Sequence, residues 1–462
     1  MSARLRELDS FFARFPHLPP EAILKEDLLR SGLRFDRAAL REAAGHKPKS
    51  YFIFSFDHAP LAEMPEETAQ RPPEEIALEG GPLGLRRTVV SVRLNPRSPY
   101  LVAGGDGGER LLVLEGRPLA RVHYPTLPAY YRRQLASGKP VLEIAPTIEW
   151  GYLIYLTVFR LCQYFGEELE CRFCDMNENY RQQRAAGRPY TGVKRVEEVL
   201  EALEIIAAAE PADSPTAARA YTVTGGSVLS QVDGLAEGPF YARYVEAIEA
   251  RFPGRWIGKV VAQALPLADV RRFKAAGARI YHPNYEVWDP DLFRTICPGK
   301  ARYIGRDEWI RRILDAAEIF GPRYVIPNFV AGIELARPYG FATVDEAIAS
   351  TAEGLDFFMA RGITPRFTTW CPEPLTPLGR QNPDGAPLEY HVRLLDAYRA
   401  ALARHGLRPP PGYGPAGVGR AVFSVSAFMD VLEPDGEGLE PGHGRPAGPA
   451  TASAGARPGA GE

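Results

Sequence analysis

The sequence predicts an α/β fold: a partial (β/α)6 TIM-like barrel, preceded by an α+β or β-rich domain and followed by a disordered tail. Three observations lead to this prediction. Strand-like and helix-like runs alternate through residues 148–428, whereas short strand-like runs separated by Pro and Gly turns fill residues 1–147. Beyond residue 428 the composition falls to Gly, Pro, Ala and Glu, which supply too little apolar surface to order a chain. We therefore expect three parts, 1–147, 148–428 and 429–462.

The first 147 residues predict a small accessory domain. An opening helical stretch precedes strand-like runs at Tyr51–Phe56, Thr88–Leu94 and Arg110–Gly116. Turn segments such as EGGPLG and AGGDGG separate these runs. No catalytic motif occurs in this part, so we expect it to cap the barrel or to recognise a carrier or peptide.

Six buried strand-like runs form the predicted barrel, and each leads into a helix or into a loop before one. The runs occupy residues 152–159, 220–224, 256–265, 278–282, 323–333 and 365–370. Apolar residues at helical spacing are clearest in Arg195–Ala209 and Arg306–Gly321. This alternation favours a parallel sheet with right-handed crossovers. The functional groups of such a barrel gather at the carboxyl ends of its strands.

Charge and composition limit the classes of partner. Lys and Arg number 55 and Asp and Glu number 57, so the chain has no basic field that would attract nucleic acid. The N-terminus lacks the apolar core of a signal peptide, and the most apolar run, Gly151–Phe159, is too short to span a bilayer. Five cysteines, three of them clustered, do not form a disulfide framework. We expect a soluble, cytoplasmic enzyme without nucleic-acid or membrane partners.

Three cysteines, Cys162, Cys171 and Cys174, follow the first predicted barrel strand, with eight residues between the first pair and two between the second. Three thiolates are one short of the number that saturates a structural zinc or an ordinary iron–sulfur cluster. A cubane held by three cysteines leaves one iron free to bind a reactant. A zinc site would need a fourth ligand, and no further His or Cys lies nearby in the sequence. The alternative is a non-catalytic zinc-binding scaffold protein with a degenerate barrel.

This cysteine loop resembles that of the radical S-adenosylmethionine (SAM) superfamily, in which an aromatic residue precedes the last cysteine, as Phe173 does here. The first gap of eight residues departs from the usual three. The resemblance implies a [4Fe–4S] cluster on the three cysteines and SAM on the open iron. It also implies reductive cleavage of SAM to a 5′-deoxyadenosyl radical, which abstracts hydrogen from a small-molecule substrate. A low-potential electron donor such as flavodoxin or ferredoxin would supply the electron.

A second motif of the same superfamily ends the second predicted strand, where Thr224, Gly225, Gly226 and Ser227 stand. In the superfamily a Gly-Gly-Glu or similar turn passes its backbone beside the amino group of SAM, and glycine permits that approach because it has no Cβ. Ser227 replaces the usual acid, so the resemblance does not supply a carboxylate here.

Further along, the chain is most similar to the biotin synthase and hydrogenase-maturase branch. That resemblance implies cofactor contacts from Glu286 and from Arg306, whose guanidinium suits the SAM carboxylate, with Lys300 and Arg302 as competitors for that contact. Gly332 matches the position where the superfamily passes its backbone beside adenine.

Other polar residues end predicted strands and could face substrate, although none is assigned a catalytic role: Gln263, His282, Asn284, Asn328, Glu334 and Trp370. Two cysteines remain outside the loop. Cys371 follows the sixth strand and is expected to pack as a small apolar residue or, as the alternative, to act in the cavity, whereas Cys297 is expected only to pack.

Overall fold

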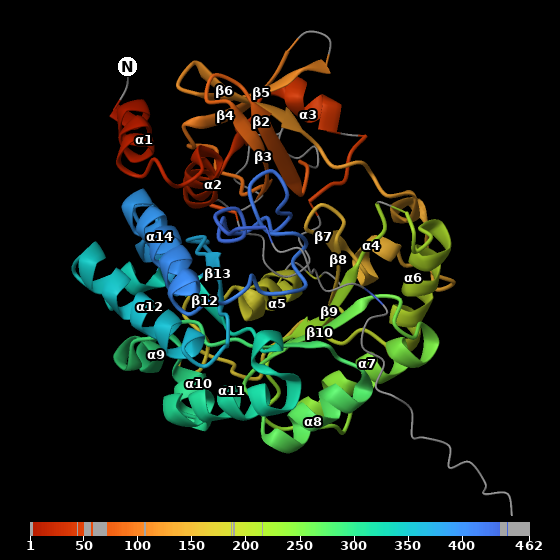
Figure 1. Cartoon of the computed structure of the whole chain (residues 1–462). Coiled ribbons are helices and arrows are strands. Elements are labelled where there is room, and N and C mark those ends of the chain that lie inside the picture. Colours follow the sequence, from red (N-terminus) through yellow and green to blue (C-terminus); the bar gives the residue numbers. More distant parts are fainter. Residues whose placement is uncertain are drawn as a thin grey trace, which may run out of the picture.

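The computed structural model has a mixed α/β architecture with two main sheets and a separate pair of strands (Figure 1). It describes residues 3–43, 45–49, 57–58, 72–105, 108–185, 187, 190–214, 216–434 and 441. The strand predicted at Tyr51–Phe56 lies outside these residues, as does nearly all of the predicted tail.

The first sheet is mainly antiparallel and has the order β1-β4-β5-β6-β2-β3. Its strands are β1 (Arg34–Phe35), β2 (Glu75–Gly80), β3 (Leu85–Ser91), β4 (Tyr100–Gly104), β5 (Arg110–Leu114) and β6 (Arg117–His123). The helices α1 (Ala3–Arg14), α2 (Pro20–Ser31) and α3 (Arg37–Ala43) accompany it. The predicted run 88–94 overlaps β3 but extends three residues too far, because the chain leaves the sheet at Val92 to pair with other segments.

The second sheet has the order β11-β10-β9-β8-β7, in which β8 to β11 are parallel and β7 is antiparallel to β8. Its strands are β7 (Thr147–Ile148), β8 (Leu153–Phe159), β9 (Ala220–Gly225), β10 (Ile257–Ala262) and β11 (Ile280–Pro283). A parallel pair, β12 (Asn328–Ala331) and β13 (Arg366–Thr369), follows, and two parallel bridges connect its region to that of β11. All six predicted strands are present, in parallel pairs that follow chain order.

Two predicted strands are longer than the strands in the structure. The run 256–265 forms a strand only over β10, and the run 323–333 only over β12. In the second case a short 3-10 helix, Pro322–Tyr324, takes the start of the run, and Pro327 has no N–H for a ladder.

Helices follow the parallel strands and cover one face of them (Figure 1). One short helix, α4 (Val141–Ile144), precedes these strands. The helices after β8 are α5 (Met176–Ala185), α6 (Val196–Ala209), α7 (Glu237–Arg251), α8 (Leu267–Ala276), α9 (Pro290–Ile296), α10 (Pro298–Tyr303), α11 (Arg306–Phe320), α12 (Val344–Met359), α13 (Pro377–Gln381) and α14 (Leu388–Arg404). Short 3-10 turns occur at Ala129–Arg132 and Ile333–Leu335. Within the described ranges, no helix is long and apolar enough to cross a membrane.

The two faces of the parallel strands differ in chemistry because side chains alternate along a strand. On the face toward the helices, Tyr281 packs against Phe273 of α8, with ring centroids 5.6 Å apart. In the same way Phe367 packs against Tyr398 of α14. The opposite face is polar, and it carries Thr224, Lys259, His282, Asn328 and Arg366.

The segment after α14 is packed between the two sheets, where Figure 1 draws it in blue. Ser424 accepts a hydrogen bond from Ser91 of β3, and Val425 accepts one from Thr369 of β13. Asp430 forms a buried ion pair with Lys25 of α2, at 2.9 Å. The packed chain therefore continues past residue 428, where the tail was expected to begin, because the carboxylate of Asp430 balances a buried lysine.

Candidate functional site

The loop between β8 and α5 carries Cys162, Cys171 and Cys174, and all three residues are half-buried. The amide of Asn177, the second residue of α5, holds the start of this loop. Its Oδ1 accepts the N–H of Cys162 at 2.9 Å, and its Nδ2 donates to the carbonyls of Cys162 and Tyr164 at 3.1 and 3.0 Å. One turn closes the end of the loop, because the N–H of Cys174 donates to the carbonyl of Cys171. The chain thus fixes the backbone of this loop with its own groups.

The three thiols lie within electrostatic reach of one another. Burial and, to a smaller extent, the neighbouring Cys171 raise the pKa of Cys162 to about 12. Burial also raises the pKa of Cys174. A hydrogen bond with Cys297 lowers the pKa of Cys171. Over the described ranges, no group of three or more His, Cys, Asp or Glu side chains is placed so that it could hold a metal ion. The donor set itself consists of soft sulfur ligands, which fit an iron–sulfur cluster and would be deprotonated on binding it.

The predicted glycine turn lies directly against this loop. A Cβ on Gly226 would stand 1.8 Å from the carbonyl oxygen of Leu161 and 2.5 Å from the Cα of Cys162. The carbonyl of Ser227 accepts the N–H of Gln163 at 2.8 Å. The structure therefore brings these two predicted motifs together at the carboxyl ends of the adjacent strands β8 and β9. Thr224, the residue before Gly225, forms a hydrogen bond with Tyr155 of β8.

Glu237, the first residue of α7, holds the segment after the glycine turn through hydrogen bonds. Its carboxylate accepts the N–H of Val228 at 2.6 Å and the side-chain amide of Gln263 at 2.6 Å. Tyr164 in turn donates to Gln263 at 2.8 Å, so one chain of bonds joins β10, the turn and the cysteine loop. Sequence reasoning missed Glu237, since a single acid at a helix start is a common cap.

The stability of the ligand-free protein is expected to depend on pH through Glu237. Burial raises the pKa of Glu237 from 4.5 to about 7. Between these values the folded protein binds more protons than the unfolded chain, so the free energy of unfolding falls as pH rises through this window. By linkage the full effect is about 3 kcal/mol. Urea unfolding at about pH 5 and about pH 8 should show this loss in the parent but not in Glu237→Gln, while Glu246→Gln, an exposed position on the same helix, keeps it.

Loss of the same pH dependence in the exposed control, or its full retention in Glu237→Gln, would contradict this assignment.

The structure pairs Glu286 with Lys300 rather than with Arg306. Lys300 Nζ lies 2.5 Å from the Glu286 carboxylate, and both side chains are buried. The positive charge of Lys300 also acts on Cys171. Arg306 donates from Nε to the carbonyl of Trp288 at 3.1 Å, and its guanidinium stacks 4.5 Å from that indole. Arg302 is exposed and forms an ion pair at 3.9 Å with Glu168, which belongs to the cysteine loop.

The other predicted residues are placed as follows. Gly332 adopts a φ of 111°, and its N–H donates to the carboxylate of Glu334 at 2.8 Å. Phe173 is partly buried against the core. Asn284 Oδ1 and Trp370 Nε1 are buried without a hydrogen-bond partner in the described chain. These two atoms lie at strand ends, where a ligand could satisfy them.

Cys297 is a neighbour of the cysteine loop, although it was expected only to pack. It is fully buried and hydrogen-bonds Cys171. Two backbone bonds hold the segments together: Arg172 N–H to the carbonyl of Ile296 at 2.9 Å, and Gly299 N–H to the carbonyl of Leu169 at 3.1 Å. No sequence signal could reveal this contact, because it depends on how α9 and α10 fold over the loop. Cys371 is also buried, beside Arg93.

Replacing Asn177 by Ala is expected to loosen the cysteine loop. The change removes the bonds to Cys162 and Tyr164 and leaves their half-buried or buried backbone groups unpaired, which costs about 3 kcal/mol. The affinity for iron should fall at least about tenfold, as it does when supporting contacts around metal ligands are lost. The measurement is the iron bound per chain after anaerobic reconstitution. Asn95→Ala, which removes two side-chain bonds in the first domain, should leave iron content unchanged. Equal iron in both variants would contradict the role of Asn177.

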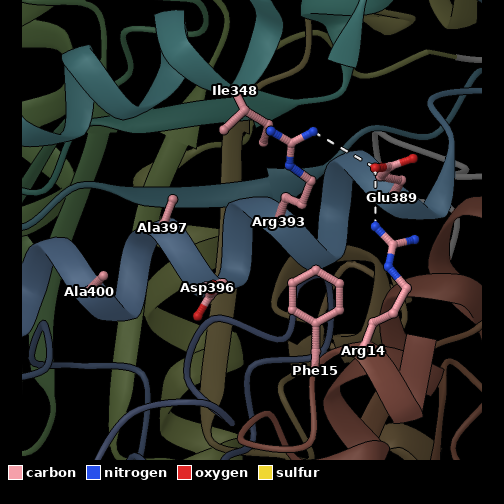
Figure 2. A pocket seen from close by; sticks show the side chains of 8 residues that line it. All are labelled: Arg14, Phe15, Ile348, Glu389, Arg393, Asp396, Ala397 and Ala400. Atoms are coloured by element: carbon pink, nitrogen blue, oxygen red, sulfur yellow. Dashed lines mark hydrogen bonds and ion pairs between the residues drawn. The ribbon is translucent and has the colours of Figure 1, made fainter. Parts of the chain in front are cut away.

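A pocket of about 370 Å³ lies elsewhere on the molecule (Figure 2). Arg14 and Phe15 face α14 there, and Glu389 forms ion pairs with Arg14 and Arg393. None of its lining residues belongs to the predicted site, and it opens between helices, away from the carboxyl ends of β8 and β9. We therefore place the candidate site at the cysteine loop and not in this pocket.

Comparisons with known proteins give a limited set of similarities. No protein-family model matches the chain. Bacteriochlorophyllide c C-7(1)-hydroxylase of Chlorobaculum limnaeum is 26% identical over 133 residues, which make up 28% of this chain and 30% of that protein. The chain thus matches less than a third of the length of this curated relative.

Two solved structures match 55% of this chain at 12% identity. Coproporphyrinogen III oxidase (HemN) from Escherichia coli, described as a radical SAM enzyme, has a TM-score of 0.32 and covers 55% of this chain and 52% of its own. Methylornithine synthase (PylB) has a TM-score of 0.35 and covers 55% of this chain and 70% of its own. The chain is therefore similar to a hydroxylase in one stretch of sequence and resembles these two enzymes weakly in structure.

Proposed function

We propose that this chain is a radical SAM enzyme whose cluster is held by Cys162, Cys171 and Cys174. The observation that carries the proposal is the contact between two motifs: the cysteine loop after β8 packs against the Gly225–Gly226 turn after β9. When bound, a [4Fe–4S] cluster would supply the electron that cleaves SAM reductively to a 5′-deoxyadenosyl radical. The cluster thus accounts for the redox chemistry, and the protein has to bind, orient and shield the reactants.

Several residues of the chain would bind SAM in this proposal. The backbone of Gly225, Gly226 and Ser227 would meet its amino group, and Gly332 would pass beside adenine. Lys300 and Arg306 are the candidate partners of its carboxylate. The charge of Lys300 near Cys171 favours Lys300 for that contact, which would require its ion pair with Glu286 to open. Phe173 and Thr224 complete the set of expected cofactor neighbours.

The proposed architecture is a partial TIM-like barrel formed by β8 to β13. The parallel pairing in chain order and the bridges Tyr281–Val325 and Glu286–Phe329 support this arrangement. The first domain would act as an accessory unit. A flavodoxin or ferredoxin would donate the electron, in the cytoplasm.

The substrate in this proposal is a small molecule that loses a hydrogen atom. The matched relative is a hydroxylase by name, which supports an enzyme acting on a C–H bond. The reaction after hydrogen abstraction stays open among rearrangement, carbon–carbon bond formation and group transfer.

The alternative function is a zinc-binding scaffold on the same three cysteines. Both functions use sulfur ligands, but only the enzyme needs a ligand-free corner beside the glycine turn. The contact of Gly226 with the backbone of Cys162 favours the enzyme, because a structural zinc gains nothing from that approach.

Anaerobic reconstitution tests the proposal. The full chain is loaded with iron and sulfide, reduced with dithionite and mixed with SAM. The enzyme is expected to yield 5′-deoxyadenosine and methionine. A loaded cluster that leaves SAM intact, or a preparation that binds one zinc and no iron, would overturn the proposal. Deuterium transferred from candidate substrates into deoxyadenosine would then identify the substrate class.

A further inference from the structure

Cys297 stands opposite Cys171 of the cysteine loop because two backbone hydrogen bonds align their segments. The residue after Cys171 donates its N–H to the carbonyl of the residue before Cys297, at 2.9 Å. The N–H of Gly299 donates to the carbonyl of Leu169 at 3.1 Å. Counting along the two segments in opposite directions from either bond places Cys171 against Cys297. The backbone thus holds the two cysteines as neighbours, independently of their side chains.

The thiols of this pair are also in contact. Cys171 forms a hydrogen bond with Cys297, whereas Cys162 and Cys174 interact with Cys171 through charge. A disulfide forms by direct attack of one sulfur on another, so thiols that already touch are the favoured pair. Cys297 is fully buried and Cys171 is half-buried, so a reagent from solvent reaches Cys171 first.

This contact engages a cysteine of the proposed ligand set. In the part of the chain that the structure describes, no three His, Cys, Asp or Glu side chains are placed so that they could hold a metal ion. The loop cysteines therefore have to rearrange before they can bind a cluster. The thiolate is the form of cysteine that binds a metal, so a sulfur joined covalently to Cys297 could not serve as a ligand. Cys171 thus has two uses that exclude each other, a bond to iron and a bond to Cys297.

We propose that Cys171 and Cys297 form a reversible disulfide in the cluster-free chain when it meets a small disulfide such as oxidised glutathione. Cys171 attacks one sulfur of the small disulfide, which forms a mixed disulfide and releases one thiol. Cys297 then attacks the Cys171 sulfur and releases the second thiol. Two protein thiols lose two electrons and two protons, and the small disulfide gains both to become two thiols.

The disulfide would keep Cys171 in an oxidation state from which a thiol reductant restores it. Without a partner, an oxidised cysteine can proceed to sulfinic and sulfonic acid, which thiols do not reverse. The consequence of the disulfide for cluster loading rests on the proposed function, whereas the disulfide itself does not.

The test treats the full, metal-free chain with oxidised glutathione, blocks the remaining thiols by alkylation and maps the linked peptides by mass spectrometry. Glu170 and Arg172 flank Cys171, so cleavage after Glu and after Arg separates it from the other two loop cysteines. The peptide that joins Cys171 to Cys297 is expected in at least about tenfold excess over every other cysteine pair. A predominant disulfide within the loop, a mixed disulfide that persists on Cys171, or the absence of oxidation would overturn the proposal.

Two variants accompany the parent chain, whose own result does not depend on how either variant folds. Cys297→Ala is expected to stop at the mixed disulfide of Cys171 with glutathione, because the second attacking sulfur is missing. Cys371→Ala removes a buried cysteine that lies outside the pair, and it should form the disulfide as the parent does. An unmodified Cys171 in the first variant, or loss of the disulfide in the second, would contradict the assignment.

Iron binding separates this inference from the proposed function. Ferrous iron alone is the probe, because sulfide would itself reduce the disulfide. The oxidised chain should bind it at least about tenfold more weakly than the same sample after reduction with dithiothreitol and desalting. Equal binding by the two samples would overturn the claim that the disulfide blocks the ligand set. A chain that forms the disulfide but binds no iron after reduction refutes only the proposed function. SAM cleavage by a chain that forms no disulfide refutes only this inference.

Discussion

Replacing Cys171 by Ala is expected to abolish both the visible charge-transfer absorption of the reconstituted protein and its cleavage of SAM. Only two thiolates would remain, and a cluster bound by two protein ligands is not retained. Cys171 is the informative choice because it also forms a hydrogen bond with Cys297 and interacts electrostatically with Lys300. Iron analysis, visible spectra and deoxyadenosine yield measure the result, with a loss of at least about a hundredfold in product.

Cys371→Ala is the matched control for that experiment. Cys371 is a buried cysteine that follows β13 and lies beside Arg93, outside the loop between β8 and α5. The variant should lose about 1 kcal/mol of stability from the small cavity and keep its iron and its activity. Full absorption in Cys171→Ala, or loss of iron in Cys371→Ala, would show that the ligand set is wrong.

Replacing Gly226 by Ala is expected to have the second largest effect. The new methyl group would stand 1.8 Å from a backbone carbonyl oxygen, and neither backbone can rotate away as a side chain would. We expect a loss of about 3 kcal/mol or more of unfolding free energy and a displaced cysteine loop. Chemical denaturation measures the stability, and iron per chain reports the loop.

Gly45→Ala separates this clash from the general cost of changing a glycine. A Cβ on Gly45 meets no atom of the described residues within 4 Å, so the free energy of unfolding of Gly45→Ala should differ from the parent by no more than about 0.5 kcal/mol. If Gly226→Ala folded with parental stability and bound iron normally, the close contact between the turn and the loop would be refuted.

Local sequence patterns were sufficient to predict the order of the barrel strands along the chain. They were also sufficient to predict one long-range contact, that of the cysteine loop with the Gly-Gly turn. Each predicted barrel strand is a short apolar run between helices, and such runs identify buried strands whatever their partners. The cysteine spacing and the Gly-Gly turn each follow a strand, and parallel strands bring their carboxyl ends to one edge. Their contact could therefore be anticipated. Strand ends were less predictable, because hydrogen-bond geometry around Pro327 and the 3-10 turn Pro322–Tyr324 decides them.

The alternation of strands and helices, the sulfur donor set and its place after β8 can all be read from the amino-acid sequence. The side chains that surround this donor set depend on tertiary packing. Glu286 pairs with Lys300, Cys297 reaches Cys171, and Arg366 meets Lys259 across Tyr413. The physical reason is that these contacts join segments far apart along the chain, where charge and hydrogen bonding act through space and leave no periodic trace in the sequence.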